Sequence, residues 1–203
     1  MVETILATGN EAVGYGAIYA GCRYFFGYPI TPQNAVPEFM SAELPKVGGV
    51  FVQAECEVAA INMLFGASAA GARAMVSTSS PGISLMGEGI SGMSACEFPG
   101  VVVDVMRMGP GWGTIQNGQT DYRMVTKGGG HGGYRCPVLA PQSPQEVFDL
   151  MQLAFYLADK YRIVAILISD YIIGEMAEPV TLHTLDFGPL PEKDWAVMGK
   201  GKK

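Results

Sequence analysis

Charge of either sign is scarce in this chain, and basic charge is the scarcest. Charged residues make up 16% of the 203 residues, against roughly 25% in typical soluble domains, and the formal net charge is −6. The first 100 residues contain no Asp, and Arg23, Lys46 and Arg73 are their only basic side chains. We therefore expect no nucleic-acid partner, and we expect another protein chain to cover much of this half.

Long apolar segments and paired cysteines are also missing. The longest uncharged run, 58–72, has 15 residues, below the roughly 17–25 that a spanning helix needs, so we expect no membrane span. No basic segment followed by an apolar one opens the chain, so nothing directs export and a cytoplasmic location is expected. Cys22, Cys56, Cys96 and Cys136 form no Cys-x-x-Cys pair. This spacing argues against a zinc ion or an iron–sulfur cluster held by this chain, and we predict no metal ligands.

Short apolar runs that alternate with helical patterns are plentiful. Six runs are typical of buried strands, namely 23–27, 49–53, 74–78, 101–105, 137–140 and 164–168. Four segments have a helical pattern, namely 10–22, 35–44, 55–71 and 144–161. This alternation predicts an α/β fold with a doubly wound, mostly parallel sheet and helices on both faces. We place this domain at 1–185. After Pro179 the sequence is irregular, and we interpret 186–203 as a linker or the start of a missing downstream domain.

Two segments that follow predicted strands could position a ligand. In the turn at 27–32, prolines bracket Ile30 and Thr31, so the turn is stiff and could present the Thr31 hydroxyl; alternatively, Pro32 merely opens a helix. Gln53-Ala-Glu-Cys-Glu57 opens a helix with no charge after Glu57. Its carboxylates either stabilise the helix dipole or sit at low dielectric, where a proton could be shared.

A third candidate is Arg107, which ends the strand at 101–106 and heads a glycine-rich loop running to Gly133. A guanidinium there suits a carboxylate or phosphate ligand, or else an ion pair with one of the scarce acids. So long a loop is usually functional or disordered. Thr78-Ser-Ser-Pro-Gly-Ile-Ser84 could supply hydroxyls and amides or simply cap a helix. His131 is interpreted as a loop residue rather than a base.

Four motifs together resemble those of the α subunit of the 2-oxoacid:ferredoxin oxidoreductases, and the resemblance covers roughly residues 3–185. They are YPITP, VQAECEVAAINMLFGASAAGAR, STSSPGISLMGEGIS and PGVVVDVMRMGPGWG. The chain is most similar to the branched-chain (3-methyl-2-oxobutanoate) and 2-oxoglutarate members. The resemblance implies a thiamine diphosphate-binding fold of the type that holds the aminopyrimidine end of the cofactor.

The resemblance also implies roles for individual residues. Glu57 matches the catalytic glutamate that contacts N1′ of the aminopyrimidine, and Glu55, two residues away, does not. Pro29 and Thr31 match the turn that lines the cofactor and substrate pocket. Arg107 matches the arginine that meets the substrate carboxylate.

As the resemblance implies, the activity is thiamine-dependent oxidative decarboxylation of a 2-oxoacid to acyl-CoA and CO2 with reduction of ferredoxin, in an anaerobic cytoplasm. The chain lacks the family's Gly-Asp-Gly motif with its metal-ligand Asn, and it lacks cluster cysteines. Mg2+ and iron–sulfur clusters are therefore expected on β and γ/δ partner subunits, and the chain alone is expected to be inactive. Family α subunits usually continue further, so a fragment, a split subunit or a truncated gene product is expected.

Met108, Trp112 and Ile115 in the loop favour an apolar, branched-chain substrate. Three alternatives stay open: a member specific for 2-oxoglutarate or pyruvate, a non-catalytic assembly subunit with a vestigial site, and a thiamine-dependent decarboxylase or synthase that does not use ferredoxin.

Overall fold

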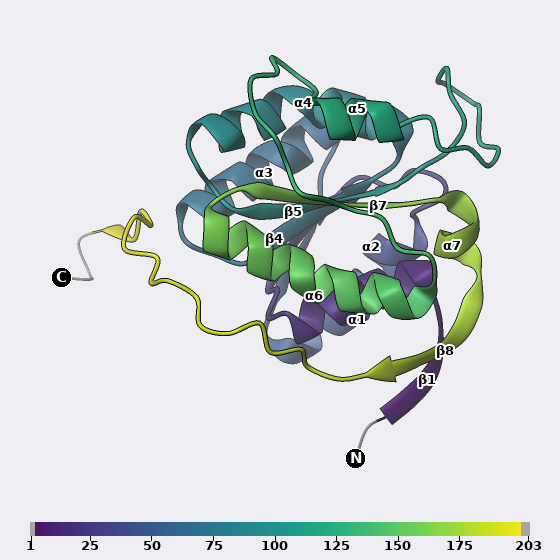
Figure 1. Ribbon diagram of the computed structural model, residues 1–203, viewed down its shortest axis with the longest axis horizontal. Coiled ribbons are helices and arrows are strands. Elements are labelled where there is room, and N and C mark those ends of the chain that lie inside the picture. The colour runs from purple at the N-terminus through teal and green to yellow at the C-terminus, as the bar shows by residue number, and fades with distance from the viewer. Residues whose placement is uncertain (1–2, 200–203) are drawn as a thin grey trace.

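Strands and helices alternate along residues 3–199, which the computed structural model describes (Figure 1). The elements are, in chain order, β1 (Glu3–Thr8), α1 (Gly9–Tyr19), β2 (Tyr24–Gly27), α2 (Ala35–Glu43), the 3-10 helix η1 (Leu44–Val47), β3 (Val50–Gln53), α3 (Glu57–Ala69), β4 (Ala74–Thr78), α4 (Ser80–Ala95), β5 (Gly100–Val105), α5 (Tyr122–Lys127), β6 (Val138–Leu139), α6 (Pro144–Tyr161), β7 (Val164–Ser169), α7 (Tyr171–Glu175) and β8 (Ala177–Leu182).

The central sheet has six strands in the order β3-β2-β4-β5-β7-β6, and every neighbouring pair is parallel. In Figure 1, α3, α4 and α5 cover one face, and α1 and α6 cover the other. The interior strands β4, β5 and β7 are buried at every residue, as expected when helices cover both faces of a parallel sheet. The prediction of a doubly wound α/β fold is confirmed.

Successive side chains of the sheet enter two separate cores. Along β5, Val103 and Val105 pack with residues of α1 and α6, while Val102 packs beneath α3 and α4. This period of two is that of an extended strand. Asp104, next in sequence to Val103, therefore points to the face that α3 and α4 cover.

A second, two-stranded antiparallel sheet joins β1 to β8 beside the main sheet. The prediction that the chain is irregular after Pro179 is wrong, because β8 continues to Leu182 and Pro179 itself pairs with Leu6. A proline is tolerated there because each strand of a two-stranded sheet is an edge strand. The alternation of inward and outward residues in β1 is irregular, with Leu6 74% exposed, so its strand pattern was missed.

Helix α4 was not assigned from the sequence because it contains four glycines, which disfavour helices. Close packing explains at least one of them: a Cβ on Gly89 would lie 2.6 Å from two carbons of Ile61 in α3. The two helices therefore approach too closely for a larger residue at this position. Tertiary packing outweighs helix propensity here.

The segment after β8 crosses the body of the domain without forming a helix or strand over 183–198. Trp195 stacks on Phe98 with 5.7 Å between ring centroids, Lys193 Nζ lies 2.7 Å from Asp159, and the Val197 amide donates to Ala69 O at 2.8 Å. The boundary at 185 and the role of 186–203 stay predictions, and residues 200–203 lie outside the described part. Among residues 3–199, no helix combines the length and apolar character needed to cross a bilayer.

Candidate functional site

The sequence-predicted residues gather at the carboxyl ends of the parallel strands. Thr31 follows β2, Glu57 follows β3 and opens α3, and Arg107 follows β5. In doubly wound sheets, ligands bind outside the carboxyl ends of the strands. Helix α4 begins between these segments, directly after β4, and its first turn contacts both Arg107 and Glu57.

Arg107 is 6% exposed, and its side chain is aimed at the turn that follows β2. Its Nη1 donates to the main-chain carbonyl oxygen of Thr31 at 3.0 Å. Its Nε is buried and has no hydrogen-bond partner among the described residues. A buried N–H without a partner is rare and calls for an explanation. A carboxylate that accepts from this guanidinium would supply one.

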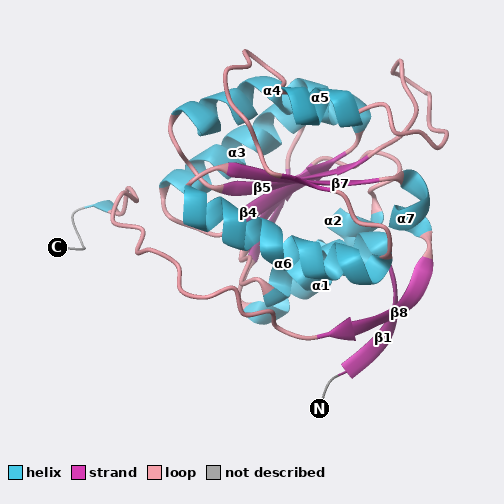
Figure 2. Cartoon of the chain, in the orientation of Figure 1, coloured by secondary structure: helices cyan, strands magenta, loops and turns pink. Residues whose placement is uncertain are grey.

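The backbone of Arg107 is held by Ser80 and Thr120. The Arg107 amide donates to Ser80 Oγ at 2.9 Å, and the Thr120 hydroxyl donates to the Arg107 carbonyl at 3.0 Å. Ser80 also hydrogen-bonds to the carboxylate of Asp121. The loop from 107 to 121 is thus closed at its base, and Figure 2 shows it as one of the long loops beside α4 and α5.

The pKa of Asp121 is raised, because burial outweighs the opposite effects of the hydrogen bond from Ser80, the charge of Arg107 and the Thr120 hydroxyl. Asp121 was not singled out from the sequence, and Ser80 was noted only within the segment 78–84 and within one of the four motifs, without a role of its own. The usable signals were an acid directly before a short helix and a serine at the end of a buried strand.

Glu57 is the first residue of α3 and is 5% exposed, whereas Glu55 is exposed. The Glu57 side chain packs against Gly82 of α4: a Cβ on Gly82 would lie 1.9 Å from Thr78 Oγ1 and 2.7 Å from Glu57 Oε1. Only glycine fits between them. The Glu57 carboxylate makes no hydrogen bond to another residue within 3–199, so it is available to a ligand or a partner.

The turn between β2 and α2 is anchored by Gln33, which is fully buried. Gln33 Nε2 donates to Tyr28 O at 3.1 Å, and its Oε1 accepts from Ser77 Oγ at 2.5 Å. Asn10 of α1 donates to Pro32 O at 2.9 Å. These bonds hold Thr31 against Arg107. Pro29 is exposed and lines a different hollow, beside Gln53, so the structure does not bring it to the Arg107 contact.

Asp104 is fully buried beneath this site, and both of its carboxyl oxygens lack a hydrogen-bond partner within the described residues. Burial and, to a smaller extent, repulsion by Asp121 raise the pKa of Asp104 well above its usual value. These effects favour the uncharged acid. Within residues 3–199, no group of three or more Asp, Glu, His or Cys side chains is placed to hold a metal ion.

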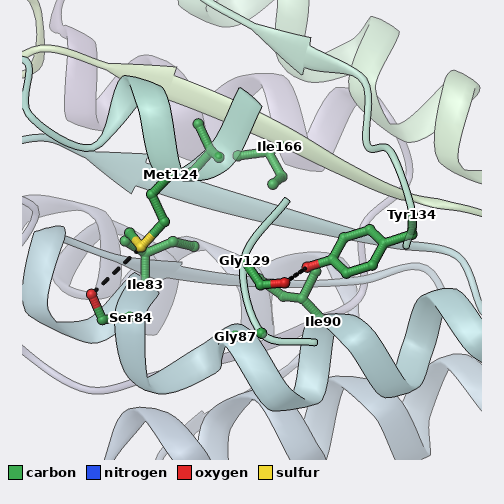
Figure 3. A pocket seen from close by; sticks show the side chains of 10 residues that line it. Ile83, Ser84, Gly87, Ile90, Met124, Gly129, Tyr134 and Ile166 are labelled. Carbon is green, nitrogen blue, oxygen red and sulfur yellow. Dashed lines mark hydrogen bonds between the residues drawn. The ribbon is translucent and has the colours of Figure 1, made fainter. Parts of the chain in front are cut away.

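A small enclosed cavity lies under α4 and α5, away from the predicted site residues (Figure 3). Ile83 and Ile90 of α4, Met124 of α5 and Ile166 of β7 contribute to its apolar wall, and the Tyr134 hydroxyl donates to Gly129 O at 3.0 Å beside it. Its volume of about 30 Å³ suits roughly one water molecule. The cavity is therefore too small for a substrate.

The fold and this arrangement match a known family. Residues 15–195, which include all four predicted site residues, match the family described as pyruvate flavodoxin/ferredoxin oxidoreductase, thiamine diphosphate-binding. The chain belongs to this family. The resemblance noted in the four sequence motifs is thereby confirmed.

Two curated relatives of this chain are subunits of 2-oxoacid oxidoreductases, in agreement with the family assignment. The chain is 52% identical over 198 residues to the ketoisovalerate oxidoreductase subunit VorB of Methanothermobacter thermautotrophicus, covering 98% of this chain and 56% of that protein. It is 47% identical over 175 residues to the 2-oxoglutarate synthase subunit KorA of Methanocaldococcus jannaschii, covering 86% of this chain and 48% of that protein. The chain thus spans about half the length of these curated relatives.

A solved structure of the same family has the same fold. It is a 2-oxoglutarate:ferredoxin oxidoreductase from Magnetococcus marinus with 2-oxoglutarate, coenzyme A and succinyl-CoA bound. The TM-score is 0.84 at 37% identity, and the match covers 87% of this chain and 31% of that one.

Proposed function

We propose that this chain is a subunit of a 2-oxoacid:ferredoxin oxidoreductase in which it holds the aminopyrimidine end of thiamine diphosphate. The observation that carries the proposal is the Glu57 carboxylate, which belongs to a residue only 5% exposed and makes no hydrogen bond within residues 3–199. Its oxygens are not among the buried atoms without a partner in the described residues, so a group from outside the chain can reach them. Family membership indicates thiamine diphosphate as that group.

In this role, Glu57 holds a proton at N1′ of the aminopyrimidine. Its place in the first turn of α3 suits a carboxylate, and Gly82 leaves the space that its side chain needs. The residues fit the cofactor in two further respects, because Thr31 and Arg107 lie at the same edge of the sheet and Arg107 has an unused, buried Nε–H. When bound, thiamine diphosphate supplies the carbon nucleophile and the electron sink for decarboxylation.

Arg107 is proposed to bind the carboxylate of the 2-oxoacid. Its Nη1 is held by Thr31 O, so the guanidinium plane is fixed before the substrate arrives. A prearranged guanidinium binds a carboxylate at lower entropic cost and places the 2-oxo carbon for reaction. Thr31 and Pro29 are proposed to line the pocket on the side of the turn after β2.

The site is proposed to be completed by partner chains. A β subunit would hold the diphosphate and Mg2+, and γ/δ subunits would hold the iron–sulfur clusters that pass electrons to ferredoxin, with coenzyme A as the acyl acceptor. Two observations support this: within the described residues there is no cluster of metal-ligating side chains, and the relatives VorB and KorA are themselves named as subunits. We also propose a cytoplasmic location, which cell fractionation would test.

A branched-chain 2-oxoacid is the proposed substrate, and the support is the 52% identity to the ketoisovalerate subunit. The loop residues contribute less, since Trp112 is 97% exposed and Met108 and Ile115 are also exposed. Trp112 lines an open hollow of about 570 Å³ with Pro81 and Leu85 of α4, and Met108 and Ile115 are not part of its lining.

The test is an assay of the complex purified with its natural partners. We expect the complex to contain bound thiamine diphosphate. We also expect it to reduce ferredoxin or a dye faster with 3-methyl-2-oxobutanoate than with pyruvate, 2-oxoglutarate or aryl 2-oxoacids. Faster turnover of 2-oxoglutarate would reject the substrate proposal alone. A complex without thiamine diphosphate would reject the catalytic role in favour of an assembly subunit. A complex that turns over without iron–sulfur partners would favour a ferredoxin-independent decarboxylase or synthase.

A further inference from the structure

We infer that Asp121 is a positioning residue for the substrate: through Ser80 it fixes Arg107, and its negative charge sets how strongly Arg107 attracts a carboxylate. The inference rests on the proposed role of Arg107 in binding the 2-oxoacid. It adds Asp121, which lies in none of the four sequence motifs, and Ser80, which lies in one of them without an assigned role.

The hydrogen bonds form a relay from Arg107 to Asp121. Ser80 Oγ accepts from the Arg107 amide at 2.9 Å, and its single hydroxyl proton can go either to the Arg107 carbonyl, at 3.0 Å, or to Asp121 Oδ2. An ionised carboxylate is the stronger acceptor. The Arg107 carbonyl then accepts from Thr120 Oγ1 at 3.0 Å. Both polar groups of the Arg107 backbone therefore keep a partner while the Ser80 hydroxyl donates to Asp121.

Helix capping does not explain Asp121. It precedes α5 at the N-cap position, but its side chain makes no capping hydrogen bond. The hydrogen bond from Ser80 joins it to the preceding helix instead. Since Asp121 is only 6% exposed, burying this carboxylate carries an energetic cost that the Ser80 bond and the nearby guanidinium offset.

The charges around Asp121 can be assigned element by element. Arg107, after β5, is the cation that acts on it, and burial of Asp104 in β5 raises the pKa of that carboxyl and so favours its uncharged form. Asp170, after β7, accepts a hydrogen bond from the side-chain amide of Gln119 at the surface. Arg107 and Asp121 therefore balance one another before substrate arrives. An incoming carboxylate is attracted by Arg107 and repelled by Asp121, and salt screens both effects little because both side chains are buried.

The experiment separates the charge of Asp121 from the geometry of the relay. Asp121→Asn keeps an oxygen that accepts from Ser80 but removes the charge, whereas Ser80→Ala keeps the charge and breaks the relay. Thr120→Val removes the hydrogen bond from the Thr120 hydroxyl to the Arg107 carbonyl and leaves Ser80 unchanged. Glu88→Gln is the matched control, because Glu88 is an exposed acid on α4, the helix that Ser80 begins. Each variant is assembled with the natural partners. KM, kcat and the affinity for thiamine diphosphate are measured, and the Kd of the 2-oxoacid is measured by calorimetry.

We expect Asp121→Asn to lower KM and Kd for the 2-oxoacid about three- to tenfold. Ser80→Ala should raise both about three- to tenfold, and Thr120→Val should raise both less. In all three variants, kcat should change less than KM, and thiamine diphosphate affinity should stay at the wild-type value. If Asp121 had a merely structural role, Asp121→Asn and Ser80→Ala would change the Kd for the 2-oxoacid in the same direction.

An unchanged or raised Kd in Asp121→Asn overturns the inference, and so does a wild-type Kd in Ser80→Ala. Failure of the proposed function has a different signature. If the wild-type complex binds the 2-oxoacid without turning it over, the catalytic role is wrong, but the Kd values of the variants still decide the role of Asp121. If it binds no 2-oxoacid, both are wrong.

Discussion

Arg107 Nη1 lies 3.0 Å from the carbonyl oxygen of Thr31, although 76 positions separate the two residues in sequence. The contact joins the loop after β5 to the turn after β2, across the intervening strand β4. It fixes the guanidinium while leaving its Nε–H without a partner. This relationship supports the role proposed for Arg107 in binding a carboxylate at the carboxyl edge of the sheet.

Removing the guanidinium should weaken substrate binding. Arg107→Ala is expected to raise the KM for the 2-oxoacid about 10- to 100-fold, because one charge-assisted contact contributes roughly 1.5–3 kcal/mol. Arg107→Lys should recover only part of the loss, since an ammonium cannot match the planar contact. Steady-state kinetics of the assembled complex would measure this. A KM unchanged in Arg107→Ala would argue against the carboxylate contact.

Filling the gap between Thr78 and Glu57 should disturb the site. In Gly82→Ala, the new methyl would lie 1.9 Å from Thr78 Oγ1 and 2.7 Å from Glu57 Oε1, so we expect displacement of Glu57, loss of turnover and destabilisation by about 1–3 kcal/mol. Gly66→Ala is the control: its methyl would meet nothing within 4 Å and should stabilise α3 by up to about 1 kcal/mol. Urea unfolding of the chain would measure both. Equal effects of the two substitutions would contradict the close packing at Gly82.

The buried acid Asp104 should make stability depend on pH. Because its pKa is raised in the folded chain, folding takes up a proton and the free energy of unfolding falls as pH rises above the unfolded-state pKa. Asp104→Asn should remove this fall. The free energy of unfolding of the variant, relative to that of the wild type, should therefore increase between about pH 5 and pH 8. Thermal unfolding at several pH values would measure it. Parallel pH profiles for variant and wild type would show that Asp104 is charged in the fold.

The thiols should differ sharply in reactivity. Burial raises the pKa of Cys22 to about 12 and that of Cys136 to about 11, so little of either thiolate exists at neutral pH. Cys96 is exposed. Iodoacetamide at about pH 8 should therefore alkylate Cys96 first and Cys22 only after denaturation, as peptide mass spectrometry would detect. Equally fast labelling of Cys22 in the folded chain would contradict its burial.

Much of the fold was predictable because β5 and β7 are buried on both faces and their apolar runs are continuous. The elements that were missed depend on tertiary contacts. Helix α4 is rich in glycine because it packs closely on α3, as Gly89 does on Ile61, and β1 pairs only with β8, far away in sequence. Local propensity contains neither kind of information.

Arg107, Thr31 and Glu57 could be proposed from the sequence because each follows a strand and each lies in a motif of the family. Their roles remain predictions. Ser80 also follows a strand and lies in a motif, but Asp121 lies in none, and the link between the two could not be found in this way. Their importance arises from a hydrogen bond between side chains 41 positions apart, and no spacing in the sequence indicates such a contact.

Replacing Glu57 with Gln, beside Glu55→Gln as the control, is the sharpest test of the cofactor-binding role. In Glu57→Gln the amide cannot exchange a proton as the carboxyl does, so 2-oxoacid-dependent ferredoxin reduction by the assembled complex should fall by at least about 100-fold. Glu55→Gln, on an exposed side chain two residues away, should retain wild-type turnover. Near-normal turnover in Glu57→Gln, or equal losses in both variants, would contradict the placement of Glu57 at the coenzyme.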